Sequence, residues 1–135
     1  MIVLDASVLA TALIDEGRDG DTARVRLRGE VLAAPELIDL EVASVLRRLV
    51  LSGQLPVQRA EQALDDLIAV PVQRAPHRPL LSRCWALREN LSVYDASYVA
   101  LAESLHSVLL TADARLSRSP GLRCAVEVLR ASPSA

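Results

Sequence analysis

Short apolar runs alternate with longer segments of helical periodicity along the chain. Residues 1–4, 31–34, 70–73 and 107–110 are mostly apolar and predict buried strands, with a weaker strand over 124–129. The intervening segments predict helices over 6–14, 21–28, 35–51, 56–68, 80–89 and 94–105. Strands that alternate with helices favour an α/β fold. We expect a three-layer α/β/α sandwich with a central, mainly parallel sheet.

The length of 135 residues suits a single domain over residues 1–130, and residues 131–135 have the composition of a disordered tail. The formal net charge of −2 excludes a globally basic nucleic-acid-binding surface, so any nucleic-acid chemistry must come from a local site. All 15 basic residues are Arg. The absence of Lys excludes the Walker A loop and argues against phosphoryl-transfer and phosphatase families that need a lysine.

The positions of cysteine and histidine and the hydropathy of the chain bear on metal binding, disulfide formation and membrane association. Cys84 and Cys124 are 40 positions apart, and His77 and His106 have no metal-ligand spacing. No apolar run approaches the ~18 residues of a membrane helix, and the first residues lack the pattern of a signal peptide. We therefore expect reduced thiols and a cytoplasmic protein with no membrane association.

Two acidic residues follow predicted strands directly. Asp5 comes after the strand over residues 1–4, and Asp113 comes shortly after the strand over 107–110. Because parallel strands end at the same edge of a sheet, both carboxylates are expected at that edge. Each has a simpler explanation by itself, since aspartate is a common N-cap of the helix that follows.

Two further acids lie on predicted helices. Glu41 shares a helix face with apolar residues four positions away on either side, so its carboxylate needs a partner, either at a functional site or in an ion pair with an arginine. Asp95 opens the helix over 94–105, where Ser92-Val-Tyr-Asp95 is similar to a capping box. Carboxylates gathered at one place repel one another, and a divalent cation relieves that repulsion. Ligation by oxygen alone suits Mg²⁺ or Mn²⁺.

Four stretches in order resemble the PIN domain, especially the VapC toxins of bacteria. They are Ile2-Val-Leu-Asp5-Ala-Ser7-Val-Leu9, Pro35-Glu-Leu-Ile-Asp-Leu-Glu41-Val-Ala-Ser-Val-Leu46, Tyr94-Asp95-Ala-Ser-Tyr98-Val-Ala-Leu-Ala-Glu103 and Leu109-Leu-Thr111-Ala-Asp113-Ala-Arg-Leu116. The resemblance covers nearly the whole chain. It implies a PIN-like fold in which Asp5, Glu41, Asp95 and Asp113 bind the metal, with Ser7 and Thr111 supporting them by hydrogen bonds.

The resemblance also implies an activity and partners. The chain would be an Mg²⁺-dependent endoribonuclease, the toxin of a type II toxin–antitoxin pair, forming a homodimer and binding a small antitoxin protein. A metal-activated water would hydrolyse the RNA phosphodiester, leaving 5′-phosphate and 3′-hydroxyl ends. Some relatives carry a further acid soon after Asp113, where this chain has Arg115, Leu116 and Ser117. The number of metal ions, one or two, therefore stays open.

Substrate binding must rely on arginine. Arg24, Arg26 and Arg28 recur at two-residue spacing, and Arg47 and Arg48 share a helix with Glu41. Guanidinium groups suit phosphate, although a solvated helix face or ion pairs are the favoured explanation of these positions. Two other functions remain open: a catalytically weak PIN domain that acts as a binding module in a regulatory complex, and a nuclease that acts on DNA.

Overall fold

The computed structural model describes residues 1–130, so the tail expected over residues 131–135 lies outside it. Five parallel strands form one sheet in the order β3-β2-β1-β4-β5. The strands are β1 (Ile2–Leu4), β2 (Leu32–Pro35), β3 (Val72–Ala75), β4 (Val108–Thr111) and β5 (Val126–Val128). This all-parallel sheet confirms the predicted α/β class.

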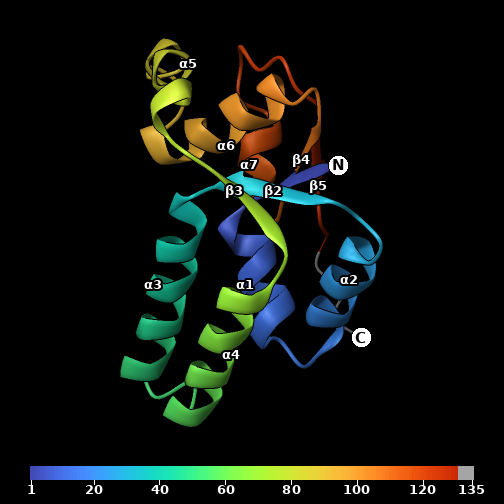
Figure 1. Ribbon diagram of the computed structural model, residues 1–135, viewed down its shortest axis with the longest axis vertical. Helices are drawn as coiled ribbons and strands as arrows, with labels where there is room; N and C mark the ends of the chain where they lie inside the picture. The colour runs from blue at the N-terminus through green and yellow to red at the C-terminus, as the bar shows by residue number, and fades with distance from the viewer. Residues whose placement is uncertain (131–135) are drawn as a thin grey trace.

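Helices cover both faces of the sheet, as Figure 1 shows. One layer holds α1 (Ala6–Ile14), α2 (Arg18–Leu27), α3 (Leu37–Leu51) and α4 (Val57–Ala69). The other holds α6 (Val93–Ser104), with α5 (Leu81–Ala86) packed against it after the 3₁₀ turn Arg78–Leu80. A short helix, α7 (Ala114–Ser117), follows β4 and packs on β5. The predicted three-layer sandwich is thereby confirmed.

The predicted elements exist, and several boundaries differ. The helix predicted from Pro35 begins at Leu37, because Pro35 is the last residue of β2. Proline fits there, since the ladder from β2 to β1 has already ended at the pair Val3–Ala33 and needs no further N–H. The helix predicted over 80–89 is instead the 3₁₀ turn followed by α5, and α2 starts three residues earlier than expected.

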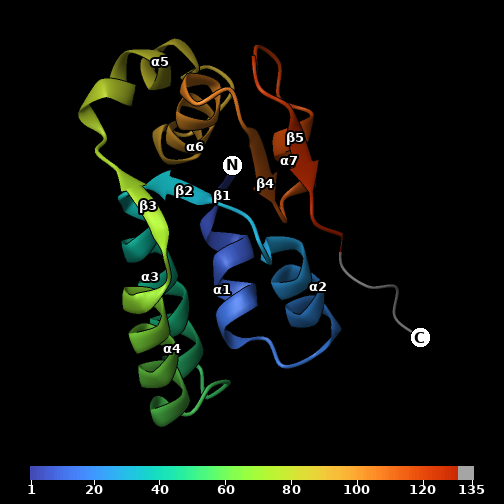
Figure 2. The same ribbon diagram turned by 45° about the vertical axis from the view of Figure 1, so that its right-hand side comes forward.

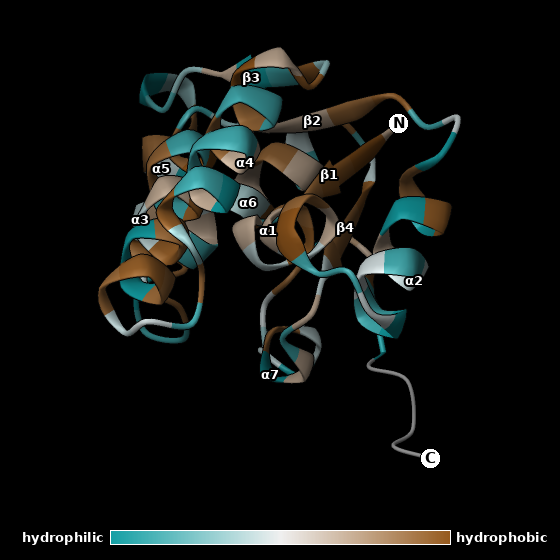
Figure 3. Ribbon diagram, turned by 90° about the horizontal axis from the view of Figure 1, so that it is seen from below, coloured by the Kyte–Doolittle hydropathy of each residue, from teal (hydrophilic) through white to brown (hydrophobic). Residues whose placement is uncertain are grey.

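Burial explains why the strands are continuous apolar runs. Val3, Leu4, Leu109 and Leu110 in β1 and β4 are all fully buried, with no exposed surface. Both faces of a parallel sheet are covered by helices, so each successive side chain enters the core. Figure 3 shows β1 and β4 as hydrophobic ribbons between the layers. Within residues 1–130, no helix combines the length and apolar character needed to span a membrane.

The order of the strands determines where a functional site can form. From β1 the chain moves outward to β2 and β3 on one side, and it later returns to place β4 and β5 on the other, as Figure 2 shows. Such a reversal opens a crevice beyond the carboxyl ends of the two central strands. The Asp5 amide donates to the Leu110 carbonyl at 3.1 Å, which fixes the ends of β1 and β4 side by side.

Candidate active site

Asp5 is the N-cap of α1 and the centre of a hydrogen-bond network at the sheet edge. Its Oδ1 accepts from the Val8 amide at 3.2 Å and from the Ser7 hydroxyl at 2.5 Å. Its Oδ2 accepts from the hydroxyl of Thr111, the fully buried last residue of β4. The Ser7 hydroxyl accepts from the Ala112 amide at 3.1 Å. The network therefore locks the end of β1 to the end of β4, and both residues expected to support Asp5 hydrogen-bond to it.

Glu41 lies on a half-buried face of α3, beside the fully covered stripe of Ile38 and Val42. The Tyr98 hydroxyl donates to Glu41 Oε1 at 2.6 Å, which joins α3 to α6. Among residues 1–130, no arginine forms an ion pair with Glu41. The ion-pair explanation considered for Glu41 is therefore wrong for the described chain, and its partner is Tyr98, a residue to which the sequence analysis gave no role at the site.

Asp95 and Asp113 lie at helix starts. Ser92 caps α6, its hydroxyl accepting from the Asp95 amide at 3.1 Å. Asp113 caps α7, and the Arg115 guanidinium grips it as a fork, with Nε at 3.2 Å from Oδ1 and Nη2 at 3.0 Å from Oδ2. Arg115 is 83% exposed, so this ion pair is open to water and easily exchanged.

Electrostatic coupling links the four acids. Burial is the main cause that raises the pKa of Asp5, Glu41 and Asp95, and repulsion from neighbouring acids adds to it. Asp95 repels Asp5 and Glu41, Asp5 repels Glu41, and Asp113 repels Asp95. Only the pKa of Asp113 is lowered, chiefly by its hydrogen bonds from Arg115. The fold has brought together residues up to 108 positions apart in a patch of excess negative charge.

The chemistry of this donor set fits a hard divalent cation, because every ligand offered is a carboxylate or hydroxyl oxygen. The arrangement is not a closed site: in residues 1–130, no three His, Cys, Asp or Glu side chains are grouped so that they could hold a metal ion. The Arg115 guanidinium is paired with Asp113, and hydroxyl groups donate hydrogen bonds to both oxygens of Asp5. A cation would bind these acids only after such contacts rearrange.

A polar cavity of about 180 Å³ adjoins the acids, and Asp95, Asp113, Arg115, Ser92 and Asn90 line it. Arg115 therefore lies at the cavity beside both carboxylates. Sequence reasoning passed over this residue when it looked only for a further acid. Its position in the sequence, two residues after Asp113, indicates that its guanidinium can reach that carboxylate.

The arginines expected to bind substrate lie elsewhere. Arg24 donates to Asp21 at 2.7 Å and to two backbone carbonyls, and Arg26 pairs with Glu127 at 2.6 Å. Arg28 is exposed just after α2, and Arg47 and Arg48 are exposed six and seven residues beyond Glu41 in α3. The fold gathers none of the five around the acids, and Arg24 and Arg26 hold structural contacts.

Comparisons with known proteins identify the family of the chain. The model of the PIN domain matches residues 2–122. The chain is 42% identical over 129 residues to Ribonuclease VapC1 of Mycobacterium tuberculosis, covering 95% of this chain and 97% of that protein. It is 43% identical over 129 residues to Ribonuclease VapC9 of the same organism, covering 96% and 98%. The crystal structure of VapBC2 from Rickettsia felis bound to a promoter DNA fragment has a TM-score of 0.70 at 14% identity, covering 96% of this chain and all of that one.

Proposed function

The chain belongs to the PIN-domain family, and from that premise we propose that it is a VapC ribonuclease, the toxin of a toxin–antitoxin pair, whose active site is the cluster of Asp5, Glu41, Asp95 and Asp113. Its relatives at 42% and 43% identity are ribonucleases matched over nearly their full length. The observation that carries the assignment of the site is spatial: Asp95 and Asp113 line one polar cavity, Asp5 and Glu41 lie near enough to repel Asp95, and within residues 1–130 no arginine forms an ion pair with Asp5, Glu41 or Asp95.

We assign Mg²⁺ to this cluster, with Mn²⁺ as a substitute, because the donors are all oxygen. The bound cation would neutralise charge on the phosphate and make water a better nucleophile at neutral pH. Asp5, Asp95 and Asp113 would bind it, with Glu41 doing so directly or through water. Ser7 and Thr111 fix the rotamer of Asp5 by hydrogen bonding, and Tyr98 does the same for Glu41.

Among the arginines of residues 1–130, Arg115 is the one that forms an ion pair with one of the four acids. Its fork to Asp113 supplies the positive charge that a cation would replace. Once released, the guanidinium would remain beside the polar cavity, where it could donate to a phosphate oxygen of the RNA. The cleaved strand therefore enters along the edge formed by the ends of β1 and β4.

The toxin role requires an antitoxin, and we propose a small protein partner that binds beside the active site of a homodimer. The fold of this chain is shared with VapBC2 of Rickettsia felis, a protein whose structure was solved on promoter DNA. A partner side chain that brings positive charge to the acids would compensate them as Arg115 compensates Asp113.

The test is cleavage of RNA and of single-stranded DNA by the purified chain with Mg²⁺, and with EDTA as the metal-free arm. We expect RNA cleavage that needs Mg²⁺, leaves 5′-phosphate ends and disappears in Asp5→Asn. Glu61→Gln, an exposed carboxylate on α4, is the matched control and should cleave normally. Cleavage of DNA alone would make the chain a DNA nuclease, and cleavage of neither would favour the binding module.

A further inference from the structure

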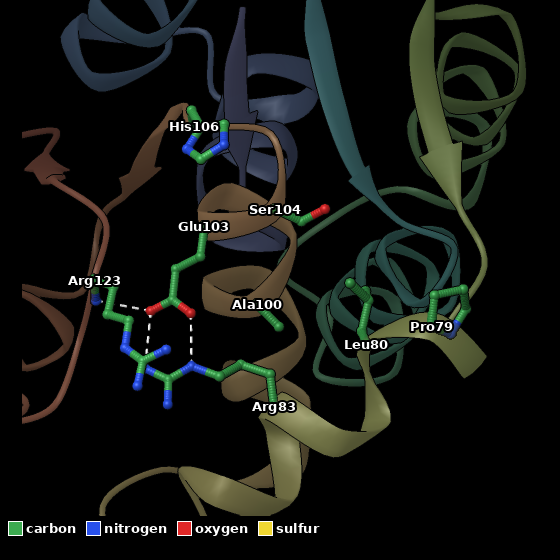
Figure 4. Close-up of a pocket in the computed structure, with 8 residues that line it drawn as sticks. All are labelled: Pro79, Leu80, Arg83, Ala100, Glu103, Ser104, His106 and Arg123. Atoms are coloured by element: carbon green, nitrogen blue, oxygen red, sulfur yellow. Dashed lines mark hydrogen bonds and ion pairs between the residues drawn. The ribbon is translucent and has the colours of Figure 1, made fainter.

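A second charged cavity lies at the opposite end of α6 from Asp95. It has a volume of about 420 Å³ and lies between the C-terminal turn of α6, the start of α5 and the segment before β5. Figure 4 shows Arg83, Arg123 and Glu103 at this cavity, with His106 on the same side of α6. Glu103 is eight residues from Asp95, so about 12 Å of helix separates the two charged regions.

The cavity has more guanidinium groups than carboxylates. Glu103 accepts from Arg83 Nε at 2.6 Å, from Arg83 Nη2 at 3.1 Å and from the Arg123 backbone amide at 2.7 Å. In residues 1–130, the Arg123 guanidinium makes no hydrogen bond or ion pair, and Arg83 Nη1 makes no hydrogen bond. Figure 4 shows both side chains directed toward Glu103. Two positive groups therefore face one carboxylate, and unused donors remain.

His106, just beyond the end of α6, forms a helix C-cap that makes the cavity less unfavourable for an anion. With φ at 51°, His106 is the one residue other than glycine among residues 1–130 that has a positive φ. Its neighbour Ser107 donates to the Ala102 carbonyl at 2.9 Å, which is the closing bond of a helix C-cap where glycine is usual. The last carbonyls of α6 are thus satisfied and repel an anion less. A positive φ is unfavourable for a residue that has a side chain. Its retention at His106, whose imidazole lies at a charged cavity, indicates a role for the imidazole.

We propose that this cavity binds a phosphate group, with the Arg123 guanidinium and Arg83 Nη1 as donors and the His106 imidazole at the other end of the cavity, where it would contact the rest of the ligand. Guanidinium groups bind phosphate in bidentate geometry, and the one carboxylate that these two arginines face, Glu103, leaves them with donors that make no hydrogen bond within residues 1–130. The volume falls in the range of about 300–1,000 Å³ that small-ligand sites occupy, so a nucleotide-sized phosphomonoester fits. The site is independent of the acids and needs no metal.

Binding should be measured by calorimetry on the full chain in EDTA, with inorganic phosphate, 5′-AMP and a short RNA as probes. We expect saturable binding that Arg123→Ala weakens about tenfold or more, because one charge-assisted pair is lost. This variant keeps the backbone bond from residue 123 to Glu103, so the fold is retained. Arg18→Ala, an exposed arginine on α2, is the charge-matched control and should bind as the wild type does.

The probes separate the sources of the phosphate. Binding of phosphate and AMP assigns the cavity to a free nucleotide, and binding of RNA alone assigns it to the RNA backbone. Equal affinity of wild type and Arg123→Ala, or no binding of any probe, would overturn the proposal. His106→Gly should raise the melting temperature, because glycine tolerates positive φ, and should weaken binding at the same time. Unchanged binding in this variant would remove His106 from the site.

Discussion

Helix α6 has a carboxylate near each end, and the two are in opposite electrostatic situations. Burial and the neighbouring Asp113 raise the pKa of Asp95. Burial would also raise the pKa of Glu103, but hydrogen bonds from Arg83 and from the Arg123 amide outweigh it, and the pKa is lowered. Both carboxylates lie on the same helix. The directions of their pKa shifts differ because Glu103 accepts hydrogen bonds from α5 and from the segment before β5.

The contrast separates a carboxylate proposed to be functional, Asp95, from a structural one, Glu103. Glu103, with a side chain 11% exposed, ties α5 and the segment before β5 to α6. The Asp95 side chain has only a local hydrogen bond with Ser92, and it adds to a repulsive cluster with Asp5 and Glu41. Native proteins tolerate such unfavourable charge where a ligand relieves it. Substitutions at the two ends should therefore affect different properties.

The largest effect is expected for Asp95→Asn. Removing a cation-binding carboxylate should reduce RNA cleavage by about 100-fold or more, while the free energy of unfolding changes by less than about 0.5 kcal/mol. Rate measurements under single-turnover conditions with Mg²⁺, together with urea unfolding, check both parts. A variant that loses stability and keeps its activity would reverse the assignment of this end of α6.

Glu103→Gln should reduce stability and leave activity unchanged, the converse of Asp95→Asn. Losing the charged partner of Arg83 should lower the free energy of unfolding by about 2 kcal/mol, since hydrogen bonds to charged groups contribute about that much. RNA cleavage under folded conditions should be unchanged. Urea denaturation measures the first and the cleavage assay the second. Glu89→Gln, an exposed acid beyond α5, is the control and should leave both properties unaffected.

Tyr98→Phe should have an intermediate effect. The hydrogen bond from Tyr98 lowers the pKa of Glu41, whereas burial and the other acids raise it. Without the hydroxyl, Glu41 holds its proton to higher pH, so the acid limb of the cleavage profile should move up and the rate near that limb should fall a few-fold, for a loss of about 1 kcal/mol. A pH–rate profile beside Tyr94→Phe, an exposed tyrosine, tests this. Identical profiles would contradict a role for Tyr98.

Arg115→Ala should have a smaller effect, and in the opposite direction. The cation no longer competes with the fork on Asp113, so affinity for Mn²⁺ measured by calorimetry should rise, by no more than about fivefold. Cleavage should fall all the same, because the guanidinium proposed to contact phosphate is gone. Arg18→Ala serves as the control for net charge. Weaker Mn²⁺ binding in Arg115→Ala would exclude competition at Asp113.

The smallest effect is on the pH dependence of stability. The folded pKa values of Asp5, Glu41 and Asp95 are raised, so their contribution is complete below the ordinary values of 3.8 and 4.5 and is lost as pH rises through the folded values. Glu103 and Glu127 have lowered values, so their contribution is present above 4.5 and is lost as pH falls through the folded values.

Urea unfolding at a series of pH values should separate these contributions. In EDTA, Asp5→Asn should lose less stability than the wild type as pH rises above 3.8 through the raised pKa of Asp5. Saturating Mg²⁺ should remove that difference, because the cation favours the ionised form of Asp5. The same pH trend in both proteins with EDTA would show that burial of Asp5 costs nothing in the free chain.

The local structure was largely predictable from the sequence. Apolar runs located the strands to within two residues at β2, β3 and β4, and helical spacing gave α1 and α3. Local caps were also readable: Asp5 accepts from Val8, and Ser92 accepts from Asp95, as their spacing suggested. These features depend on contacts within four residues, so a linear pattern contains them.

What the sequence determined by itself is the list of acids, the edge that Asp5 and Asp113 share and the absence of lysine. Only the tertiary structure decided which charges are compensated. Tyr98 meets Glu41 across 57 positions, Thr111 meets Asp5 across 106, and Arg83 meets Glu103 across 20. Such pairs depend on strand order and on how α3, α5 and α6 pack. For Asp5, Glu41 and Glu103 the sign of the pKa shift follows from that packing, whereas the lowered pKa of Asp113 comes from Arg115, two residues away in the chain.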